Sequence, residues 1–231
     1  MEIRPEEIIG MIDHAVLAPD ATRDDVLAAC ELCAELRTAS ICIHPRWVEL
    51  AVAALEGTEV SVGTVAGFPL GATTSEVKAF EARQAVARGA DEIDMVLAIT
   101  ALKSGDHSAV REDIAAVVGA AYAANLEEPV VKVILETCYL TDEEKRVAVQ
   151  LAVGAGADFV KTSTGLGPEG ATVENVRLLR EVAPESVGVK AAGGIRTLAG
   201  CRAMIEAGAN RIGTSSTRKI AEELHAAGSA G

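Results

Sequence analysis

Eight short runs rich in β-branched residues alternate with longer segments of helical periodicity, and this alternation constrains the fold more than any other feature. Strands that alternate with helices are typical of βα units around a parallel sheet, and eight such units close into a barrel. A further helical segment precedes the first run. We therefore predict an α/β protein, a single (β/α)8 TIM barrel with an extra N-terminal helix. The runs lie near 11–14, 40–44, 60–66, 91–97, 130–136, 157–162, 187–191 and 210–214.

The chain has a suitable size for one barrel domain. It contains 231 residues, 49% of them hydrophobic, and no linker or low-complexity segment interrupts the pattern. We predict one domain over 1–231 with a flexible tail at 226–231. The segments ARGADEIDMVL, GAGADFVKTS and EAGANRIGTS echo one another. In each, a glycine is placed to end a helix in the left-handed conformation before the next strand.

Composition excludes several classes of function. The net charge of −13 argues against binding to nucleic acid, which requires clustered lysine and arginine. The chain has no run of 18 uncharged apolar residues and begins with an acidic stretch, so we expect a soluble, cytosolic protein that does not bind membranes. Five cysteines without a second CxxC favour neither a disulfide framework nor a zinc ribbon. A small molecule is the expected partner.

Two lysines lie near the ends of apolar runs, Lys161 in ADFVKTSTG and Lys190 in SVGVKAAGG. Burial lowers the pKa of a lysine, and a second ammonium about 6 Å away lowers it by about two more units at an effective dielectric of about 20. A neutral amine can attack a carbonyl carbon to form a Schiff base. The pair therefore indicates an amine nucleophile, while the alternative that both side chains reach solvent from strand ends stays open.

Alternation along the strands predicts which side chains face the barrel interior. In DEIDMVL, Glu92 and Asp94 should face the lumen. Asp13 and Cys42 should converge there with Asp94 and the two lysines, at the carboxyl ends of the strands where barrel enzymes place their active sites. Asp94 could hold one ammonium and transfer protons, or it could form a structural salt bridge.

A third lysine extends this pattern. Lys132, Lys161 and Lys190 are each 29 residues apart, about one βα unit, which predicts similar heights on successive strands. Lys132 shares a strand face with Glu136. These two residues either pair structurally or orient the site.

Donor-rich loops follow the last three predicted strands. Their backbone amides can hold a phosphate, because the loops after the seventh and eighth strands are the usual phosphate site of this fold. The candidate ligands are Thr164, Gly165, Gly193, Gly194, Arg196, Ser215 and Ser216.

Two other motifs are less specific. GFPLG at 67–71 is predicted to form a rigid loop that is either part of the site or a plain structural turn. His14 and His44 lie near strand ends, but no HxH or HExxH spacing joins them to a third ligand, so we expect neither a metal nor a cofactor.

The motifs together resemble the deoxyribose-phosphate aldolase family, whose members are class I aldolases of (β/α)8 fold. The resemblance runs nearly from end to end. Its motifs are IDHAVL (12–17), ICIHPRWV (41–48), GTVAGFPLG (63–71), GADEIDMVL (89–97), KVILET (132–137), GADFVKTSTG (156–165), VGVKAAGGIRT (187–197) and RIGTSS (211–216).

The resemblance implies an activity and a role for each site residue. Lys161 corresponds to the lysine that forms the Schiff base, Lys190 to the lysine that perturbs it and transfers protons, and Asp94 to a proton donor and acceptor. Asp13 resembles the supporting acid of the first strand. The implied reaction is reversible cleavage of 2-deoxy-D-ribose 5-phosphate, a step of deoxyribose catabolism, to D-glyceraldehyde 3-phosphate and acetaldehyde. It needs no metal, and the implied assembly is a homodimer or homotetramer.

The chain departs from the family pattern at several positions. His44 stands where many relatives have Asn, Ala98-Ile99-Thr100 where they have Asn-Ile-Gly, and Thr217 where a Gly often follows the serine pair. Leu166 replaces a lysine found in some relatives, and no tyrosine follows Tyr139 to assist proton transfer from the tail.

Two other functions remain as alternatives. One is a Schiff-base aldolase that acts on a different phosphosugar. The other is a catalytically silent barrel that senses a sugar phosphate, which would need the glycine loops and Arg196 but would have no use for Lys161, Lys190 and Asp94 together.

Overall fold

A closed barrel of parallel strands forms the centre of the molecule. The computed structural model describes residues 5–124 and 129–228. Within these ranges eight strands pair in chain order, and β1 also pairs with β8, which closes the sheet and confirms the predicted barrel. Every predicted run overlaps a strand. The strands are β1 (Ile12–Val16), β2 (Ser40–Ile43), β3 (Ser61–Ala66), β4 (Glu92–Val96), β5 (Val130–Ile134), β6 (Phe159–Lys161), β7 (Gly188–Ala192) and β8 (Arg211–Thr214).

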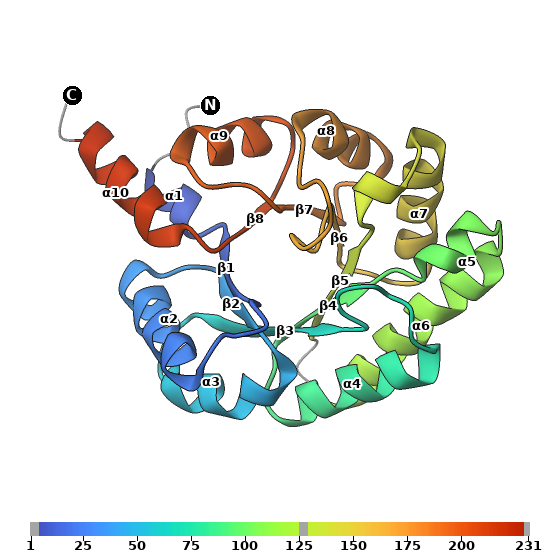
Figure 1. The fold of residues 1–231 in the computed structure, drawn as a ribbon, viewed down its shortest axis with the longest axis horizontal. Helices are drawn as coiled ribbons and strands as arrows, with labels where there is room; N and C mark the ends of the chain where they lie inside the picture. The colour runs from blue at the N-terminus through green and yellow to red at the C-terminus, as the bar shows by residue number, and fades with distance from the viewer. Residues whose placement is uncertain (1–4, 125–128, 229–231) are drawn as a thin grey trace.

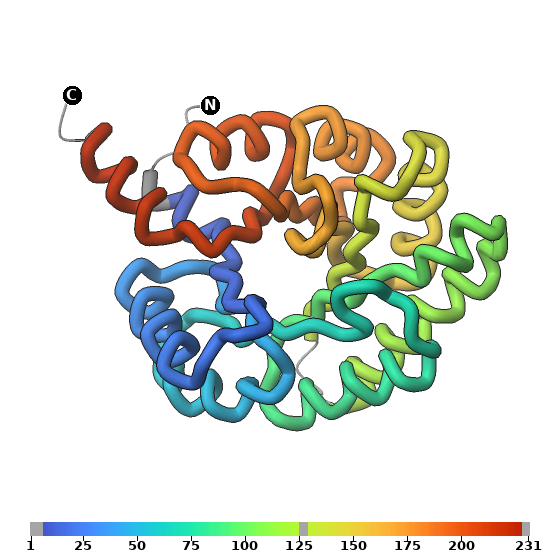
Figure 2. Tube along the Cα trace, in the orientation of Figure 1, coloured from blue at the N-terminus to red at the C-terminus, as the bar shows by residue number. Residues whose placement is uncertain are grey.

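Helices connect successive strands and surround the barrel as an outer ring (Figure 1). The predicted extra helix is α1, which lies close to α10 where the chain ends its circuit (Figure 2). Short 3-10 turns cover Pro45–Trp47 and Thr137–Tyr139. The helices are α1 (Pro5–Ile9), α2 (Arg23–Leu36), α3 (Val48–Ala54), α4 (Ser75–Ala87), α5 (Ile99–Lys103), α6 (His107–Ala124), α7 (Asp142–Gly154), α8 (Val173–Val182), α9 (Leu198–Glu206) and α10 (Thr217–Gly228).

Local sequence signals fix where the helices begin and end. Thr22 and Thr141 form capping boxes at the starts of α2 and α7, so side chains satisfy amide groups that the first helical turn leaves without partners. The glycines of the three echoed segments have positive φ: 96° at Gly89, 88° at Gly156 and 109° at Gly208. The prediction that they end helices in the left-handed conformation is confirmed.

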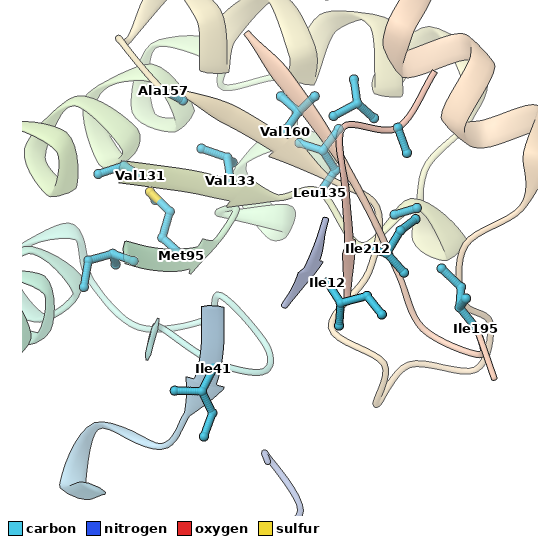
Figure 3. Close-up of a cluster of buried hydrophobic side chains, with 14 of the residues drawn as sticks. Ile12, Ile41, Met95, Val131, Val133, Leu135, Ala157, Val160, Ile195 and Ile212 are labelled. Carbon is cyan, nitrogen blue, oxygen red and sulfur yellow. The ribbon is translucent and has the colours of Figure 1, made fainter. Parts of the chain in front are cut away.

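On several strands an apolar side chain that faces the helices is next in sequence to a charged side chain that faces the lumen. Ile12, Met95, Val133, Val160 and Ile212 are completely buried and belong to the hydrophobic cluster shown in Figure 3. Each is a sequence neighbour of a polar lumen residue, because side chains alternate between the two faces of a strand. The layer between strands and helices therefore supplies the hydrophobic core, which leaves the lumen free to hold charged groups.

Strand register sets the heights of the three interior lysines. Lys161 pairs directly with Lys190, as predicted, but Lys132 pairs with Phe159. Lys132 is therefore out of register with the other two lysines by two residues. The strands of a closed barrel are staggered, so a constant spacing in sequence does not give a constant register.

A buried ion pair joins α4 to α6 and to the end of β4. The Nζ of Lys78 donates to Oδ2 of Asp113 at 2.6 Å and to the carbonyl of Val96 at 2.9 Å. Ser75 donates its hydroxyl to Oδ1 of Asp113 at 2.9 Å. Lys78 is completely buried, so this pair connects the helical ring to the strand that carries Asp94.

Lys78 also packs against the GFPLG loop. At Gly67, where φ is 62°, a Cβ would lie 2.8 Å from the Cε of Lys78. A side chain at this position would therefore push the lysine away from Asp113.

α10 continues to Gly228, and residues 229–231 of the predicted tail lie outside the described residues. Across 5–124 and 129–228, no helix combines the length and apolarity that crossing a membrane requires.

Lys78→Met should destabilise the protein by about 3 to 5 kcal/mol, because it leaves the carboxylate of Asp113 buried without its cation. The double variant Lys78→Met with Asp113→Leu should recover most of that loss, since it removes both buried charges. Urea unfolding measures both values. Equal stability of the single variant and the wild type would contradict this account of the α4–α6 contact.

Candidate active site

Asp94 on β4 accepts hydrogen bonds from three lysines inside the barrel. Its Oδ2 lies 2.7 Å from the Nζ of Lys161 and 2.8 Å from that of Lys190, while Oδ1 lies 3.0 Å from the Nζ of Lys132. All four side chains are almost completely buried. The predicted convergence of Asp94 with Lys161 and Lys190 is therefore confirmed in its geometry.

Asp13 on β1 is a second carboxylate that contacts two of these lysines. Its Oδ2 lies 2.5 Å from the Nζ of Lys190 and 3.7 Å from that of Lys132, and its Oδ1 accepts from Arg211 on β8 at 2.5 Å. Lys190 is thus held between Asp13 and Asp94. This arrangement agrees with the expected supporting position of Asp13.

Glu92 completes the ionic network at the deeper end of the lumen. Its Oε2 accepts from Lys132 at 2.6 Å, and its Oε1 accepts from Arg211 at 2.9 Å. Its neighbour in register on β3 is Gly63, where an added Cβ would make ordinary contact with the Cβ of Glu92 at 3.6 Å.

Burial and charge act in opposite directions on the groups of this network. Burial alone would raise the pKa of Asp94, but the ammonium groups of Lys132, Lys161 and Lys190 outweigh it and hold the pKa well below its usual range. Burial likewise acts to raise the pKa of Asp13, but Lys190, Lys132 and Arg211 hold it below its usual range. Both acids are carboxylates at neutral pH.

The cationic partners of these acids hold their protons firmly. Burial acts to lower the pKa of Lys132 and of Lys190, but the neighbouring carboxylates raise both above the usual lysine value. For Lys132 the main acidic neighbours are Asp94 and Glu92, and for Lys190 they are Asp13 and Asp94. Both lysines are therefore ammonium groups at neutral pH.

Cys42 on β2 also reaches this centre. Its Sγ lies 4.0 Å from Oδ2 of Asp94, in agreement with its predicted place in the lumen. Burial, together with the charge of Asp94, raises the pKa of the Cys42 thiol to about 11. The thiol is therefore neutral at physiological pH.

A cavity of about 560 Å³ opens above the lysines, at the carboxyl ends of the strands. Lys161 and Lys190 line it together with Asp13 and Cys42, while Asp94 accepts from both lysines but is not among the lining residues. The cavity therefore gives a small molecule access to Lys161 and Lys190, whereas Lys132 does not line it.

The predicted phosphate loops form one wall of this cavity. Six of the seven candidate ligands line it, together with Leu166 and Asp20. Ser216 is not among the lining residues, and its backbone amide donates to Oγ1 of Thr214 at 2.9 Å. The lining candidates are Thr164, Gly165, Gly193, Gly194, Arg196 and Ser215.

Glu136 holds the first of these loops in place. It is buried, has a φ of 54°, and accepts from both the hydroxyl and the backbone amide of Thr164, the latter at 3.2 Å. Lys132 binds Glu92 and Asp94 instead, so the suggested pairing of Lys132 with Glu136 is wrong. Glu136 follows β5 in the left-handed conformation, which turns its side chain toward β6 rather than along the strand face.

Other singled-out residues have local partners. The Nδ1 of His14 and Oγ1 of Thr217 lie 2.7 Å apart, and burial lowers the pKa of His14 to about 4. His44 contacts the carbonyl of Ala18 at 3.3 Å. Residues 67–71 are not among those that line the cavity, which favours the reading of GFPLG as a structural turn.

Sequence reasoning missed one member of the network and left another without a role. Arg211 is the first residue of β8, and an arginine at that position is typical of a strand end that is exposed to solvent. Its register with Lys190 is what places its side chain inside the barrel. Glu92 was expected to face the lumen but was assigned no partner. Its position two residues before Asp94 was the available signal, because residues two apart on a strand share a face.

The chain is similar to known aldolases over most of its length. A model described as DeoC/LacD family aldolase matches residues 8–223. The deoxyribose-phosphate aldolase of Thermoanaerobacter pseudethanolicus is 56% identical over 216 residues, which cover 94% of this chain and 96% of that protein. The deoxyribose-phosphate aldolase of Thermococcus gammatolerans is 54% identical over 218 residues, with coverage of 94% and 96%.

Solved structures show the same similarity. A crystal structure described as a putative deoxyribose-phosphate aldolase from Coccidioides immitis has a TM-score of 0.93 and 38% identity, and the match covers 97% of this chain and 88% of that one. Deoxyribose phosphate aldolase from Aeropyrum pernix, described as tetrameric, has a TM-score of 0.89 and 34% identity, with coverage of 96% and 93%. The chain belongs to the DeoC/LacD family of aldolases, which are carbon–carbon lyases.

Proposed function

We propose that this protein reversibly cleaves 2-deoxy-D-ribose 5-phosphate to D-glyceraldehyde 3-phosphate and acetaldehyde through a Schiff base on Lys161. The observation that carries the proposal is the position of the Lys161 Nζ, which lines the cavity while sharing one oxygen of Asp94 with Lys190. The names of relatives at 54% and 56% identity support the choice of substrate.

The ionic network favours Lys161 as the nucleophile. Lys190 is held between two carboxylates, whereas within the described part of the chain Lys161 pairs with that of Asp94 alone. A lysine with fewer carboxylate partners gives up its proton more readily, because less attraction is lost when the charge disappears. The resulting neutral amine attacks the aldehyde carbon of the open-chain sugar, and loss of water gives a protonated imine.

The protonated imine then serves as the electron sink for cleavage. The C3 hydroxyl loses its proton, the C2–C3 bond breaks, and its electron pair moves toward the imine nitrogen to form an enamine while the three-carbon aldehyde phosphate leaves. Protonation of the enamine carbon and addition of water then release acetaldehyde and the free amine. No step of this sequence calls for a metal ion.

Asp94 and Lys190 act together in the proton transfers. Asp94 is a carboxylate that is not among the cavity-lining residues, so it accepts the hydroxyl proton through a water. Lys190 is an ammonium in the cavity wall and serves as the proton donor. Asp13 supports Lys190 from the opposite side at 2.5 Å.

The glycine-rich loops bind the phosphate group in this proposal. Gly165, Gly193 and Gly194 have positive φ and line the cavity, so their loops bring backbone amides close to a ligand. Arg196 contributes a cationic side chain at the rim. Leu166 is 55% exposed at this wall, so the phosphate here meets a leucine where some relatives present a lysine.

The proposal extends to the assembly and to partners. We propose a homodimer or homotetramer of single-domain subunits, and the tetrameric Aeropyrum pernix relative supports an oligomer. The charge of −13 favours a small phosphosugar bound in the cavity over a polyanion bound to the surface.

Lys161→Ala should abolish cleavage of deoxyribose 5-phosphate while the protein stays folded, because Asp94 keeps two ammonium partners. Release of the three-carbon aldehyde phosphate, measured with a coupled dehydrogenase, should fall at least about 10⁴-fold, the scale expected when a covalent nucleophile is removed. A melting curve controls for folding. A wild type that cleaves only a different phosphosugar from a panel of pentose and hexose phosphates would redirect the proposal to that substrate.

Lys190→Leu and Lys190→Arg should separate the effect of the Lys190 charge on Lys161 from the role of Lys190 in proton transfer. The leucine variant removes a positive charge beside Lys161, so the acid limb of the pH–rate profile should move to higher pH and the maximum rate should fall. The arginine variant keeps the charge but holds its proton. It should form the acetaldehyde imine, measured by borohydride trapping, yet lose most turnover. Near-normal cleavage with unshifted profiles in both variants would reduce Lys190 to a structural role.

Ser215→Ala should raise the KM for deoxyribose 5-phosphate at least about tenfold and leave that for unphosphorylated deoxyribose nearly unchanged. A hydrogen bond to a charged group is worth about 1.5 to 3 kcal/mol. Ser216→Ala is the matched control, because Ser216 does not line the cavity. Equal losses on both substrates would move the phosphate site elsewhere.

A further inference from the structure

The charges inside the barrel do not balance when every group is ionised. The interior network contains three carboxylates and four cationic side chains, so it carries one net positive charge in that state. Removal of a single proton makes it neutral. The carboxylates are Asp13, Glu92 and Asp94, and the cationic groups are Lys132, Lys161, Lys190 and Arg211.

The ion pairs are distributed unequally among the four cations. Arg211 contacts Asp13 and Glu92, Lys190 contacts Asp13 and Asp94, and Lys132 contacts all three acids. Among the described residues, Lys161 pairs with one carboxylate, that of Asp94. Lys161 is therefore the cation of the network with the fewest carboxylate partners, and it also lines the cavity.

The remaining strands contribute no compensating charge to this network. From β2 the group that faces Asp94 is Cys42, whose thiol is neutral because its pKa is raised to about 11. From β3 the residue beside Glu92 is Gly63. The network's charge within the described residues is thus set by the seven ionisable side chains of β1 and β4 to β8.

Glu92, Lys132 and Arg211 are not among the residues lining the cavity and have no part in the proposed reaction steps. Of these three, Glu92 and Arg211 form the pair that joins β4 to β8. They bind each other at 2.9 Å. Arg211 also lies over the ring of Phe159, with its Cζ 5.8 Å from the ring centroid. Room for that ring depends on Gly188, where a Cβ would lie 2.1 Å from it.

We propose that Glu92 and Arg211 are positioning residues that set the charge balance of the lumen, so that Lys161 is the lysine that becomes the neutral amine. Arg211 is suited to this role because a guanidinium does not lose its proton in proteins. It supplies a fixed positive charge that occupies Asp13 and Glu92. This inference rests on the proposed Schiff-base function and assigns that reaction two further residues.

The proposal predicts opposite shifts from two substitutions in contact. Arg211→Met removes a positive charge, so Lys161 holds its proton more firmly and the acid limb of kcat/KM moves to higher pH. Glu92→Gln removes a negative charge, so the limb moves to lower pH. At an effective dielectric of about 20, a unit charge about 10 Å away changes a proton affinity by about one pH unit. We expect shifts of about that size, and the double variant should return close to the wild-type limb.

The profiles are best measured with unphosphorylated 2-deoxyribose, because the phosphate of the natural substrate titrates near pH 6 and would obscure the limb. Arg211→Lys keeps the charge and should leave the limb within a few tenths of a pH unit of wild type. Lys103→Met is the matched surface control, since Lys103 also pairs with a glutamate, at 2.9 Å, but is exposed. It should cause no shift. A melting curve verifies that each variant is folded.

The outcomes separate this inference from the function on which it rests. A wild type that does not cleave deoxyribose or its phosphate contradicts the proposed function. A wild type that cleaves while Arg211→Met and Glu92→Gln shift the limb in the same direction, or do not shift it, overturns the charge-balance role and leaves these residues as structural supports. A shift of equal size in Lys103→Met would overturn it as well.

Discussion

One carboxylate shared by three ammonium groups is the interaction on which the interior of this protein depends. Each charge alone would be costly to bury, because removal from water costs several kcal/mol per ion. Asp94 offsets that cost for Lys132, Lys161 and Lys190 together, at distances of 2.7 to 3.0 Å. The same sharing leaves the lysines unequal, since two of them have further carboxylate partners. The reactivity proposed for Lys161 follows from that inequality.

The barrel makes this arrangement possible because the residues that stabilise the fold and the charged residues of the lumen lie on opposite faces of the strands. The apolar faces of the strands pack against the ring of helices, so the core that holds the fold together lies outside the lumen. The lumen can then contain seven ionisable side chains from six strands without weakening that core. Another buried ion pair, between Lys78 and Asp113, lies in the helical ring and connects α4 and α6 to the end of β4.

The sequence predicts the fold and the centre of the site but not the whole network. Asp94, Lys161 and Lys190 could be placed together from the alternation within DEIDMVL and from the two apolar runs that end in lysine. The face of a strand on which a side chain lies depends only on this local periodicity. The register of Lys132 does not follow from the 29-residue spacing, because barrel stagger arises from closure of the sheet, which no local spacing encodes. Arg211 and the Lys78–Asp113 pair depend on contacts between distant segments, so nothing near them in the sequence indicated a buried partner.

The central claim is that Lys161 alone among the interior lysines is available as an amine. Borohydride reduction of the wild-type protein in the presence of acetaldehyde, followed by proteolysis and peptide mass mapping, tests it directly. The account predicts one two-carbon adduct, located on Lys161 in the peptide that contains FVKTSTG, with Lys132 and Lys190 unmodified. An adduct on Lys190 or Lys132, or the absence of any adduct in a protein that cleaves deoxyribose 5-phosphate, would contradict it.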